Sequence, residues 1–515
     1  MLVPFRNEPP TDFSQPAERA AFEAALQQAA DRFDEEYPLL IGSEPVYSGE
    51  WIDSYNPCQR DQRVGRVARA TPRLAERALD AAWATYPDWS HLASAARARI
   101  LWKAAALLRR RKHEFSALMV YEVAKTWAEA DADTAEAIDF LEYYGREMVR
   151  LAEPPTLAVV PGEENEQVYE PLGAGLIIPP WNFPLAILAG MTAAAIVAGN
   201  TVVLKPASLA PVVAARFVEL LREAGLPPGV VNFLPGPGGV VGDLLVEHPR
   251  TRFVSFTGSR EVGIQIYERA ARVATGQRWL KRVVAEMGGK NAVVVDSTAD
   301  LAAAAAGIVA SAYGFQGQKC SACSRVVALD EVHDALLERV AAETWALRVG
   351  PAADPDTNVA ALVDRAQYDK VLEYVNIGRG EGRLVCGGEP GDPAGYYVQP
   401  TIFADVAPAA RIAQEEIFGP VVAFLRAADF ERAIAIANDT QYGLTGAVYA
   451  RDRGRLEYAR RAFRVGNLYL NRKCTGALVG VQPFGGFDMS GTDAKAGGPD
   501  HLLQYLQAKV IAERF

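Results

Sequence analysis

One cysteine of this sequence stands where the chain is expected to turn sharply from a helix into a strand. The Ala-rich helical pattern 301–313 ends at Gly314, Cys320 follows, and an apolar strand pattern begins at Arg325. Backbone N–H groups at such a corner have no helical partners, so they can stabilise a thiolate and later an oxyanion. A free cysteine more often packs as a small buried hydrophobe, and Cys323 fits that alternative better.

Two further residues offer the chemistry that a cysteine nucleophile needs. Glu286 ends the strand pattern 283–285 and is followed by two glycines, which makes it a candidate buried general base with a raised pKa. Asn182 lies in a proline-braced loop just after a strand pattern, where a dinucleotide-binding fold places its ligand. An amide held there can donate to a developing oxyanion, although an asparagine in a turn has a simpler structural explanation.

A nucleotide cofactor has two candidate contact points. Lys205 ends the strand pattern 201–204 and is fixed by Pro206, so its ammonium could reach ribose hydroxyls or a phosphate, although most such lysines are surface residues. Gly258 and Ser259 close a strand and open a helix, and a helix N-terminus is a natural pyrophosphate site. The usual G-x-G-x-x-G fingerprint is absent, so these positions alone give a weak prediction.

The C-terminal part of the chain has groups suited to a flat ring and to a carboxylate. Glu416 lies in an acidic cluster stiffened by Gly-Pro, and Phe418 is available to pack on a ring. The Gly-rich segments 475–477 and 482–486 carry backbone N–H groups that could hold a carboxylate.

The elements that must position these residues follow a β-α-β alternation from Gly173 onward, which predicts a parallel, doubly wound α/β sheet. The strand patterns cover 175–178, 201–204, 230–234 and 252–256, and the helical patterns cover 185–197, 212–224, 240–247 and 261–274. A second series runs from Arg282 to about Gly480. Before the sheet, a helical pattern covers 17–37, and segments 158–161 and 166–170 alternate like an exposed hairpin.

Composition excludes several classes of function. The 515 residues are too many for one core, and the net charge of −10 argues against nucleic acid or anionic lipid as a main partner. Five scattered cysteines suit a reducing cytoplasm, and five scattered histidines argue against a metal centre or a His-based triad. The longest uncharged runs fall short of the ~20 strongly apolar residues of a membrane span, and the start of the chain lacks a signal-peptide pattern.

Taken together, these motifs resemble the aldehyde dehydrogenase superfamily. Seven of them occur in the order and at about the spacing of that family, within residues 40 to 515: 180–184, 205–206, 256–259, 286–291, 317–320, 416–420 and 483–486. The resemblance implies an NAD(P)-dependent enzyme with a doubly wound cofactor domain, an α/β catalytic domain and a small β oligomerisation flap.

The resemblance also implies a role for each motif residue. Cys320 would attack the aldehyde carbon, its own N–H and the Asn182 amide would hold the oxyanion, and Glu286 would activate the water that hydrolyses the thioester. The implied cofactor-binding residues are Pro180, Trp181, Lys205, Ser208, Gly258, Ser259, Glu416 and Phe418.

Within the superfamily, the sequence is most similar to the bacterial branch that oxidises L-glutamate γ-semialdehyde, formed from Δ1-pyrroline-5-carboxylate, to L-glutamate in the second step of proline catabolism. The segments that carry this similarity are 4–9, 135–140, 314–321 and 471–480. The similarity implies that Ser321, Gly476 and Ala477 take the substrate carboxylate. The other implied substrate contacts are Phe183 and Phe484 along the aliphatic chain, Lys319 as a positive charge, and Glu136 near the aldehyde.

Two departures from the family pattern leave questions open. Ser208 stands where many NAD-preferring members have Glu, so NADP is also a candidate cofactor, and Asp488 stands where Lys is common, with no functional account. An alternative function is a succinate or α-aminoadipate semialdehyde dehydrogenase. A catalytically silent scaffold is a further alternative, against which the combination of Cys320, Asn182 and Glu286 argues.

The resemblance implies three structural parts. A dinucleotide-binding domain would comprise 1–151, with a helical N-terminal extension over 1–40, and 171–286. A catalytic domain would comprise 287–484, and an oligomerisation flap 152–170 and 485–515. The family uses this flap to form dimers, so a homodimer or a dimer-based higher oligomer is expected.

Overall fold

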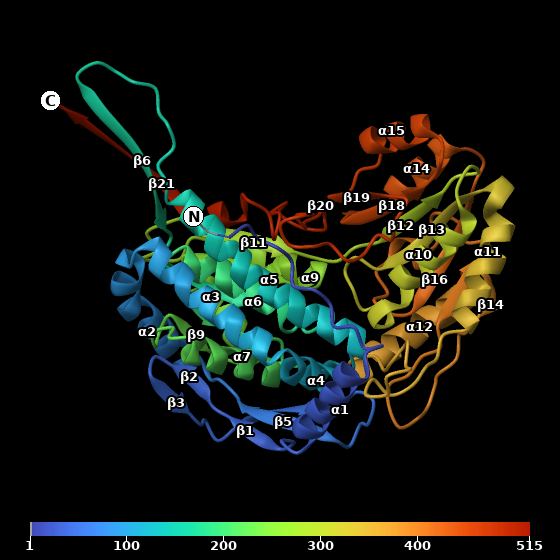
Figure 1. The fold of residues 1–515 in the computed structure, drawn as a ribbon, viewed down its shortest axis with the longest axis horizontal. Helices are drawn as coiled ribbons and strands as arrows, with labels where there is room; N and C mark the ends of the chain where they lie inside the picture. Colours follow the sequence, from blue (N-terminus) through green and yellow to red (C-terminus); the bar gives the residue numbers. More distant parts are fainter. Residues whose placement is uncertain (1–2) are drawn as a thin grey trace.

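Two seven-stranded sheets form the framework of the molecule (Figure 1). The computed structural model describes residues 3–515. The first sheet has the order β11-β10-β7-β8-β9-β2-β3. Its strands are β2 (Leu39–Ile41), β3 (Glu44–Val46), β7 (Ala174–Ile178), β8 (Thr201–Leu204), β9 (Val231–Phe233), β10 (Phe253–Thr257) and β11 (Arg282–Glu286). Strands β7 to β11 are parallel, whereas β2 pairs antiparallel with both β3 and β9, so the predicted doubly wound sheet is confirmed.

Helices cover both faces of this sheet. They are α2 (Pro72–His91), α6 (Ala186–Val197), α7 (Pro211–Glu223), α8 (Asp243–Glu247) and α9 (Arg260–Ala271), with a π-helical turn at Gly238–Gly242. Three long helices, α3 (Ser94–Arg110), α4 (Lys112–Val123) and α5 (Trp127–Leu151), pack outside α6 and α7. Helix α6 is apolar around its whole circumference because it lies between the sheet and α5.

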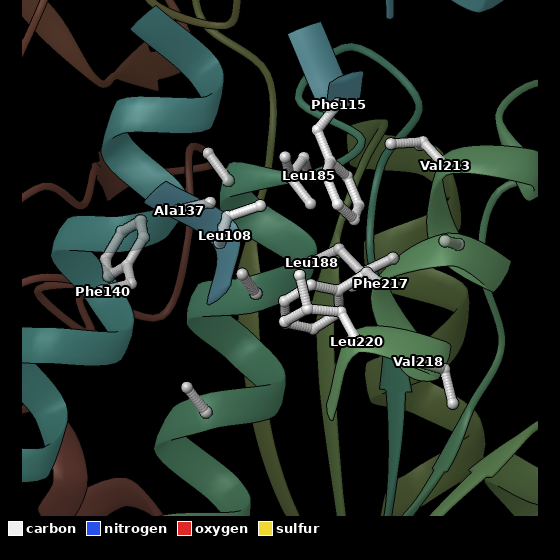
Figure 2. Close-up of a cluster of buried hydrophobic side chains, with 14 of the residues drawn as sticks. Leu108, Phe115, Ala137, Phe140, Leu185, Leu188, Val213, Phe217, Val218 and Leu220 are labelled. Carbon is white, nitrogen blue, oxygen red and sulfur yellow. The ribbon is translucent and has the colours of Figure 1, made fainter. Parts of the chain in front are cut away.

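The largest hydrophobic core lies among these helices. Figure 2 shows part of it, where Leu108, Phe115 and Phe140 face side chains of α6 and α7 such as Leu188 and Phe217. All five are at most 5% exposed, so this helical layer is fixed by close packing. Within residues 3–515, no helix is both long enough and apolar enough to cross a membrane.

The N-terminal helix is shorter than the pattern 17–37 predicted. Helix α1 (Pro16–Ala30) ends before Asp34, which has a left-handed φ of 65° and redirects the chain. The next residues form strand β1 (Glu35–Tyr37), which pairs in parallel with β5 (Arg63–Ala68); β4 (Trp51–Tyr55) pairs with the other edge of β5. The helical prediction for 31–37 is therefore wrong, because pairing with a distant strand decides the conformation there.

The second sheet has the order β14-β15-β16-β13-β12-β18-β19, with only β14 antiparallel to its neighbour. Its strands are β12 (Asn291–Val295), β13 (Cys323–Leu329), β14 (Arg383–Cys386), β15 (Thr401–Ala404), β16 (Val421–Ala427), β18 (Thr445–Tyr449) and β19 (Asn467–Leu470). The helices of this half are α10 (Leu301–Tyr313), α11 (Asp330–Trp345), α12 (Arg365–Glu381), α13 (Arg411–Gln414), α14 (Phe430–Asn438) and α15 (Arg453–Ala462). Two separate apolar clusters, one on each face, hold these helices to the sheet.

A two-stranded sheet projects from the body (Figure 1). It consists of β6 (Glu163–Pro171) and β21 (Leu506–Arg514), paired antiparallel along their whole length. The predicted hairpin is wrong, because 158–161 is not a strand and β6 finds its partner more than 300 residues away.

Residues 485–505, part of the expected oligomerisation flap, lie instead on the body. Strand β20 (Phe487–Asp488) pairs with β17 (Tyr442–Gly443), and a 3-10 turn at His501–Tyr505 contacts α5 and α6. Leu502 and Tyr505 in this turn are both completely buried, and burial of such large apolar side chains explains why the segment stays on the body.

Candidate active site

The turn that precedes Cys320 has an unusual backbone. Phe315, Gln316 and Gly317 have positive φ values of 49°, 58° and 70°. The conformation is held in place by Gln316, whose side-chain amide donates to the carbonyls of Ala124 (3.0 Å) and Ala361 (2.8 Å). Non-glycine residues in this region cost about 1–3 kcal/mol each and persist where the surroundings enforce them, which is frequent at functional sites.

A single amide clamps the loop that carries Cys320. The Nδ2 atom of Asn291 donates to the carbonyls of Cys320 (2.7 Å) and Ala322 (2.9 Å). Its Oδ1 accepts from the N–H of Thr445 at 3.0 Å. Asn291 is only 3% exposed, so the loop is tied to the ends of β12 and β18 from inside the protein. Asn291 ends the sequence motif 286–291, but the motif alone does not indicate this clamping role.

The thiol of Cys320 is partly exposed, and its surroundings disfavour the thiolate. Burial raises its pKa to about 12, and the nearby carboxylates of Glu416 and Glu286 add to the shift. The backbone N–H groups of Ser321 and of Cys320 itself act in the opposite direction, as the corner geometry predicted, but burial outweighs them. The thiolate must therefore form when a base or a bound ligand changes this balance.

Asn182 reaches this loop from the other sheet. It follows β7, is 5% exposed, and its Nδ2 donates to the carbonyl of Gln318 at 3.0 Å. Gln318 is itself anchored, because its Oε1 accepts from the N–H of Val363 at 3.0 Å. An amide carries two N–H groups, so Asn182 keeps one donor beside the nucleophile's loop.

Glu286 lies among glycines at the end of β11. A Cβ atom at Gly485 would be 3.0 Å from its Oε1, and one at Gly491 would be 3.2 Å from its Oε2. Neither carboxyl oxygen has a hydrogen-bond partner within residues 3–515, although both are buried. Burial raises the pKa of Glu286 well above its usual value. A buried carboxyl without a partner is costly and marks a group that needs a water or a substrate atom.

The candidate cofactor residues lie along the first sheet and beside the catalytic loop. Lys205 follows β8 and is 6% exposed; within residues 3–515 its Nζ donates only to the carbonyl of Pro206, at 3.5 Å, and burial lowers its pKa to about 8. Ser259 caps helix α9, and Gly258 precedes it and donates to the carbonyl of Glu286 at 3.0 Å. Ser208 is exposed in the loop after β8.

Glu416 and Phe418 come from the second half of the molecule. The Oε1 of Glu416 accepts from the N–H of Gly289 at 2.9 Å, and burial raises the pKa of this carboxyl. Phe418 has a left-handed φ of 60°, and its ring meets that of Trp181 edge-on at 5.6 Å. The adjacent Pro180 is buried. Glu416 and Phe418 therefore lie next to the segments that hold Cys320 and Asn182.

A buried ion pair, which the local sequence does not reveal, lies against the segments that carry Asn182 and Cys320. The Nζ of Lys125 is 3.0 Å from Asp133, and both side chains are completely buried. The same ammonium lies 4.0 Å from the ring centre of Phe183 and 4.3 Å from that of Phe315. Asp133 also accepts from the N–H of Ala186 at 2.6 Å, at the start of α6. Lys125 follows the apolar end of α4, and that context was the only available signal of its burial.

The candidate substrate residues differ in how far they are buried. Ser321 is buried, and Phe183 and Phe484 are partly exposed. Lys319 pairs with Glu129 at 2.6 Å, so its charge is largely balanced within the protein. Burial raises the pKa of Glu136 to about 8.

The loop after β19 contains the two remaining candidates. Gly476 has a φ of 75°, which suits glycine, and it is exposed, while Ala477 is partly exposed. The guanidinium of Arg472 donates to the Thr475 and Gly476 carbonyls at 3.1 Å, so both carbonyls are hydrogen-bonded within the loop.

Two residues left open by the sequence have structural explanations. Cys323 is 1% exposed at the start of β13, and its Sγ donates to the carbonyl of Arg325 at 3.4 Å, which is the packed cysteine that its position predicted. Asp488 has a φ of 52° in β20 and forms an ion pair with Arg464 at 3.0 Å on the surface.

Comparison with known proteins agrees with this geometry. The model of the aldehyde dehydrogenase family matches residues 46–511. The 1-pyrroline-5-carboxylate dehydrogenase of Geobacillus thermodenitrificans (strain NG80-2) is 59% identical over 515 residues, covering all of both chains. The solved structure of 1-pyrroline-5-carboxylate dehydrogenase from Thermus with bound NAD has a TM-score of 0.99 and 53% identity, again covering both chains completely.

A longer protein contains the same fold as one of its parts. Proline utilization A (PutA) from Bdellovibrio bacteriovorus matches with a TM-score of 0.98 and 44% identity, over 99% of this chain and 53% of that chain. The family model covers most of the sequence, and the identities lie far above the level at which only the fold is shared. This chain belongs to the aldehyde dehydrogenase family.

Proposed function

We propose that this protein oxidises L-glutamate γ-semialdehyde to L-glutamate with NAD as the hydride acceptor, the second step of proline catabolism. The observation that carries the proposal is the convergence on one partly exposed thiol, Cys320, of a buried amide, Asn182, and the Glu286 carboxyl, whose oxygens lack hydrogen-bond partners among residues 3–515. The substrate is supported by the full-length similarity to 1-pyrroline-5-carboxylate dehydrogenases.

The residues present fit a nicotinamide dinucleotide. Lys205 has a buried ammonium with a single weak contact, and Glu416 has one oxygen that no residue within 3–515 occupies. They would hold ribose hydroxyls, Gly258 and Ser259 would lie at the pyrophosphate, and Trp181 with Phe418 would pack beside the ring. Bound NAD supplies the acceptor for the hydride that leaves the substrate carbon.

The chain's own residues carry the covalent steps. The Cys320 sulfur bonds to the aldehyde carbon while its proton passes to water, and the resulting oxyanion is held by the Cys320 N–H and the Asn182 amide. Loss of hydride from the same carbon converts the adduct to a thioester. The ionised form of Glu286 then takes a proton from water, and the hydroxide oxygen bonds to the carbonyl carbon. The C–S bond breaks, the leaving thiolate takes the proton from Glu286, and a carboxylic acid is released.

The residues around the thiol would select a short aldehyde with a carboxylate at its far end. We place that carboxylate at the N–H groups of Gly476 and Ala477 and at the Ser321 hydroxyl, with Phe183 and Phe484 along the chain. Lys319 and Glu136 complete the polar lining.

A panel of aldehydes tests the proposed substrate. We expect kcat/KM for L-glutamate γ-semialdehyde to exceed that for succinate semialdehyde, α-aminoadipate semialdehyde and simple aliphatic aldehydes. Equal turnover of the simple aldehydes would contradict the assignment. A parallel titration of NAD and NADP tests the cofactor, because exposed Ser208 leaves no carboxylate there to repel a 2′-phosphate.

The assembly and location that fit this function are a homodimer, or a dimer-based higher oligomer, in the cytoplasm. In the projecting sheet, β21 and the residue that follows it carry the exposed apolar side chains of Val510 (66%), Ile511 (42%) and Phe515 (82%), which a partner would cover. All five cysteines are free thiols, as a reducing compartment allows. Light scattering of the purified protein measures the assembly directly.

A further inference from the structure

A cavity of about 450 Å³ lies beside the catalytic turn, and it touches two parts of the candidate site. On one side its lining includes Glu129 and Gly314. A Cβ atom at Gly314 would be 2.8 Å from the Oε1 of Glu129 and 3.3 Å from the Nζ of Lys319, the residue before Cys320. The wall of the cavity therefore adjoins the loop that carries the nucleophile.

The other side of the cavity leads to the loop after β19. Its lining includes Lys473, whose Nζ is 3.7 Å from the position that a Cβ atom would take at Gly476. Gly476 is one of the two residues whose N–H groups we place at the substrate carboxylate. The cavity thus lies between the start of the turn that leads to Cys320 and the start of the loop that holds Gly476, and Lys473 lines it on the side of that loop.

Among the cations that line this cavity, and Lys319 beside it, Lys473 is the one that forms no ion pair within residues 3–515. Lys319 is paired with Glu129 at 2.6 Å, and Arg19, which also lines the cavity, is paired with Glu23 at 3.4 Å. Within residues 3–515, Lys473 has no carboxylate oxygen within 4.0 Å. Burial lowers the pKa of Lys473, and repulsion from Lys319 and Arg472 adds to this effect, while Glu129 offsets it in part. Three cations therefore lie near one carboxylate that is already paired with Lys319, an arrangement that favours an added anion.

We propose that Lys473 captures anionic aldehydes in this cavity and guides their carboxylate onto the N–H groups of Gly476 and Ala477. The inference rests on the proposed function and names a residue that sets its substrate class. Lys473 does not contact the reacting atoms, so it is a specificity-determining residue. A positive charge at a concave site raises the local concentration of an anionic substrate and its rate of association, and salt weakens the effect.

The test compares Lys473→Met and Lys473→Arg with the unchanged protein in steady-state assays with NAD. For L-glutamate γ-semialdehyde, we expect Lys473→Met to lower kcat/KM about tenfold, equivalent to ~1.4 kcal/mol, almost entirely through KM. Lys473→Arg should restore most of the loss because it keeps the charge. Turnover of neutral propanal should be unchanged in both variants. Lys103→Met removes another exposed, unpaired lysine, on α3, and should change neither substrate's constants.

Ionic strength gives a second readout that a merely structural role would not move. Raising the salt concentration should lower kcat/KM for the anionic aldehyde in the unchanged protein and much less in Lys473→Met. If Lys473→Met keeps both the KM and the salt dependence of an enzyme that prefers the anionic aldehyde, the inference is wrong. If the unchanged protein does not prefer the anionic aldehyde over propanal, the proposed function fails first, and the inference fails with it.

Discussion

Asn291 and Glu286 lie at the two ends of one short segment beside Cys320, but their polar atoms differ in hydrogen bonding. Asn291 uses both N–H groups and its oxygen in hydrogen bonds of 2.7 to 3.0 Å to three backbone groups. Glu286 has two buried oxygens without partners among residues 3–515. Satisfied polar groups hold a geometry, whereas an unsatisfied one keeps its capacity for a reacting molecule.

A contrast of charge, not of hydrogen bonding, separates two buried lysines. The ammonium of Lys125 lies 3.0 Å from the carboxylate of Asp133 and beside two aromatic rings, so its charge is compensated inside the protein even though the pair lacks good hydrogen-bond geometry. Lys205 has no carboxylate partner within residues 3–515, and its hydrogen bond there is a weak one, to a carbonyl at 3.5 Å. We infer that the contacts of Asn291 and Lys125 hold the structure of the site. Glu286 acts on the reacting molecule, and Lys205 binds the cofactor. The following substitutions test that division, in order of expected effect.

Removing the nucleophile should have the largest effect. Cys320→Ala is expected to abolish aldehyde oxidation, because no other group would form the thioester, while NAD binding measured by calorimetry stays close to normal. Cys323→Ala, three residues away on β13, is the matched control and should remain active. Substantial residual turnover in Cys320→Ala would identify a different nucleophile.

Glu286→Gln should separate the two halves of the reaction. Loss of the base should slow steady turnover by about 10²–10⁴-fold, while a rapid burst of reduced cofactor remains because thioester formation precedes hydrolysis. Rapid mixing in a stopped-flow instrument measures both phases. Disappearance of the burst would mean that Glu286 acts before acylation.

Breaking the Lys125–Asp133 pair should act on stability. Lys125→Met leaves a carboxylate buried without its partner, which costs about 3–5 kcal/mol of unfolding free energy. The double variant Lys125→Met/Asp133→Asn removes both charges and should recover much of this loss in denaturant titrations. An unchanged stability of Lys125→Met would show that the pair is not a structural support.

Asn291→Ala should have a smaller effect on activity than either Cys320→Ala or Glu286→Gln. It leaves two buried carbonyls and one N–H without partners, at about 1–3 kcal/mol for each unsatisfied group that water cannot reach. We expect kcat to fall with little change in KM for NAD, because the clamp holds the Cys320 loop and not the cofactor. A normal kcat would contradict a positioning role.

Local sequence patterns were enough to predict the parallel sheets and the corner at Cys320, because buried parallel strands and the helix that leads to this turn have strong local signatures. They could not predict the pairing of β6 with β21, or of β1 with β5, since those depend on residues far apart in the chain. The burial of Lys125 was equally invisible, because a lysine after an apolar helix is usually expected at the surface.

The most direct test of the account is to stop the reaction of Glu286→Gln with L-glutamate γ-semialdehyde and NAD during the first turnover and map the modified peptide by mass spectrometry. We expect a γ-glutamyl thioester on Cys320 that accumulates as reduced cofactor appears. A modification on another residue, or a full burst with Cys320 unmodified, would contradict it.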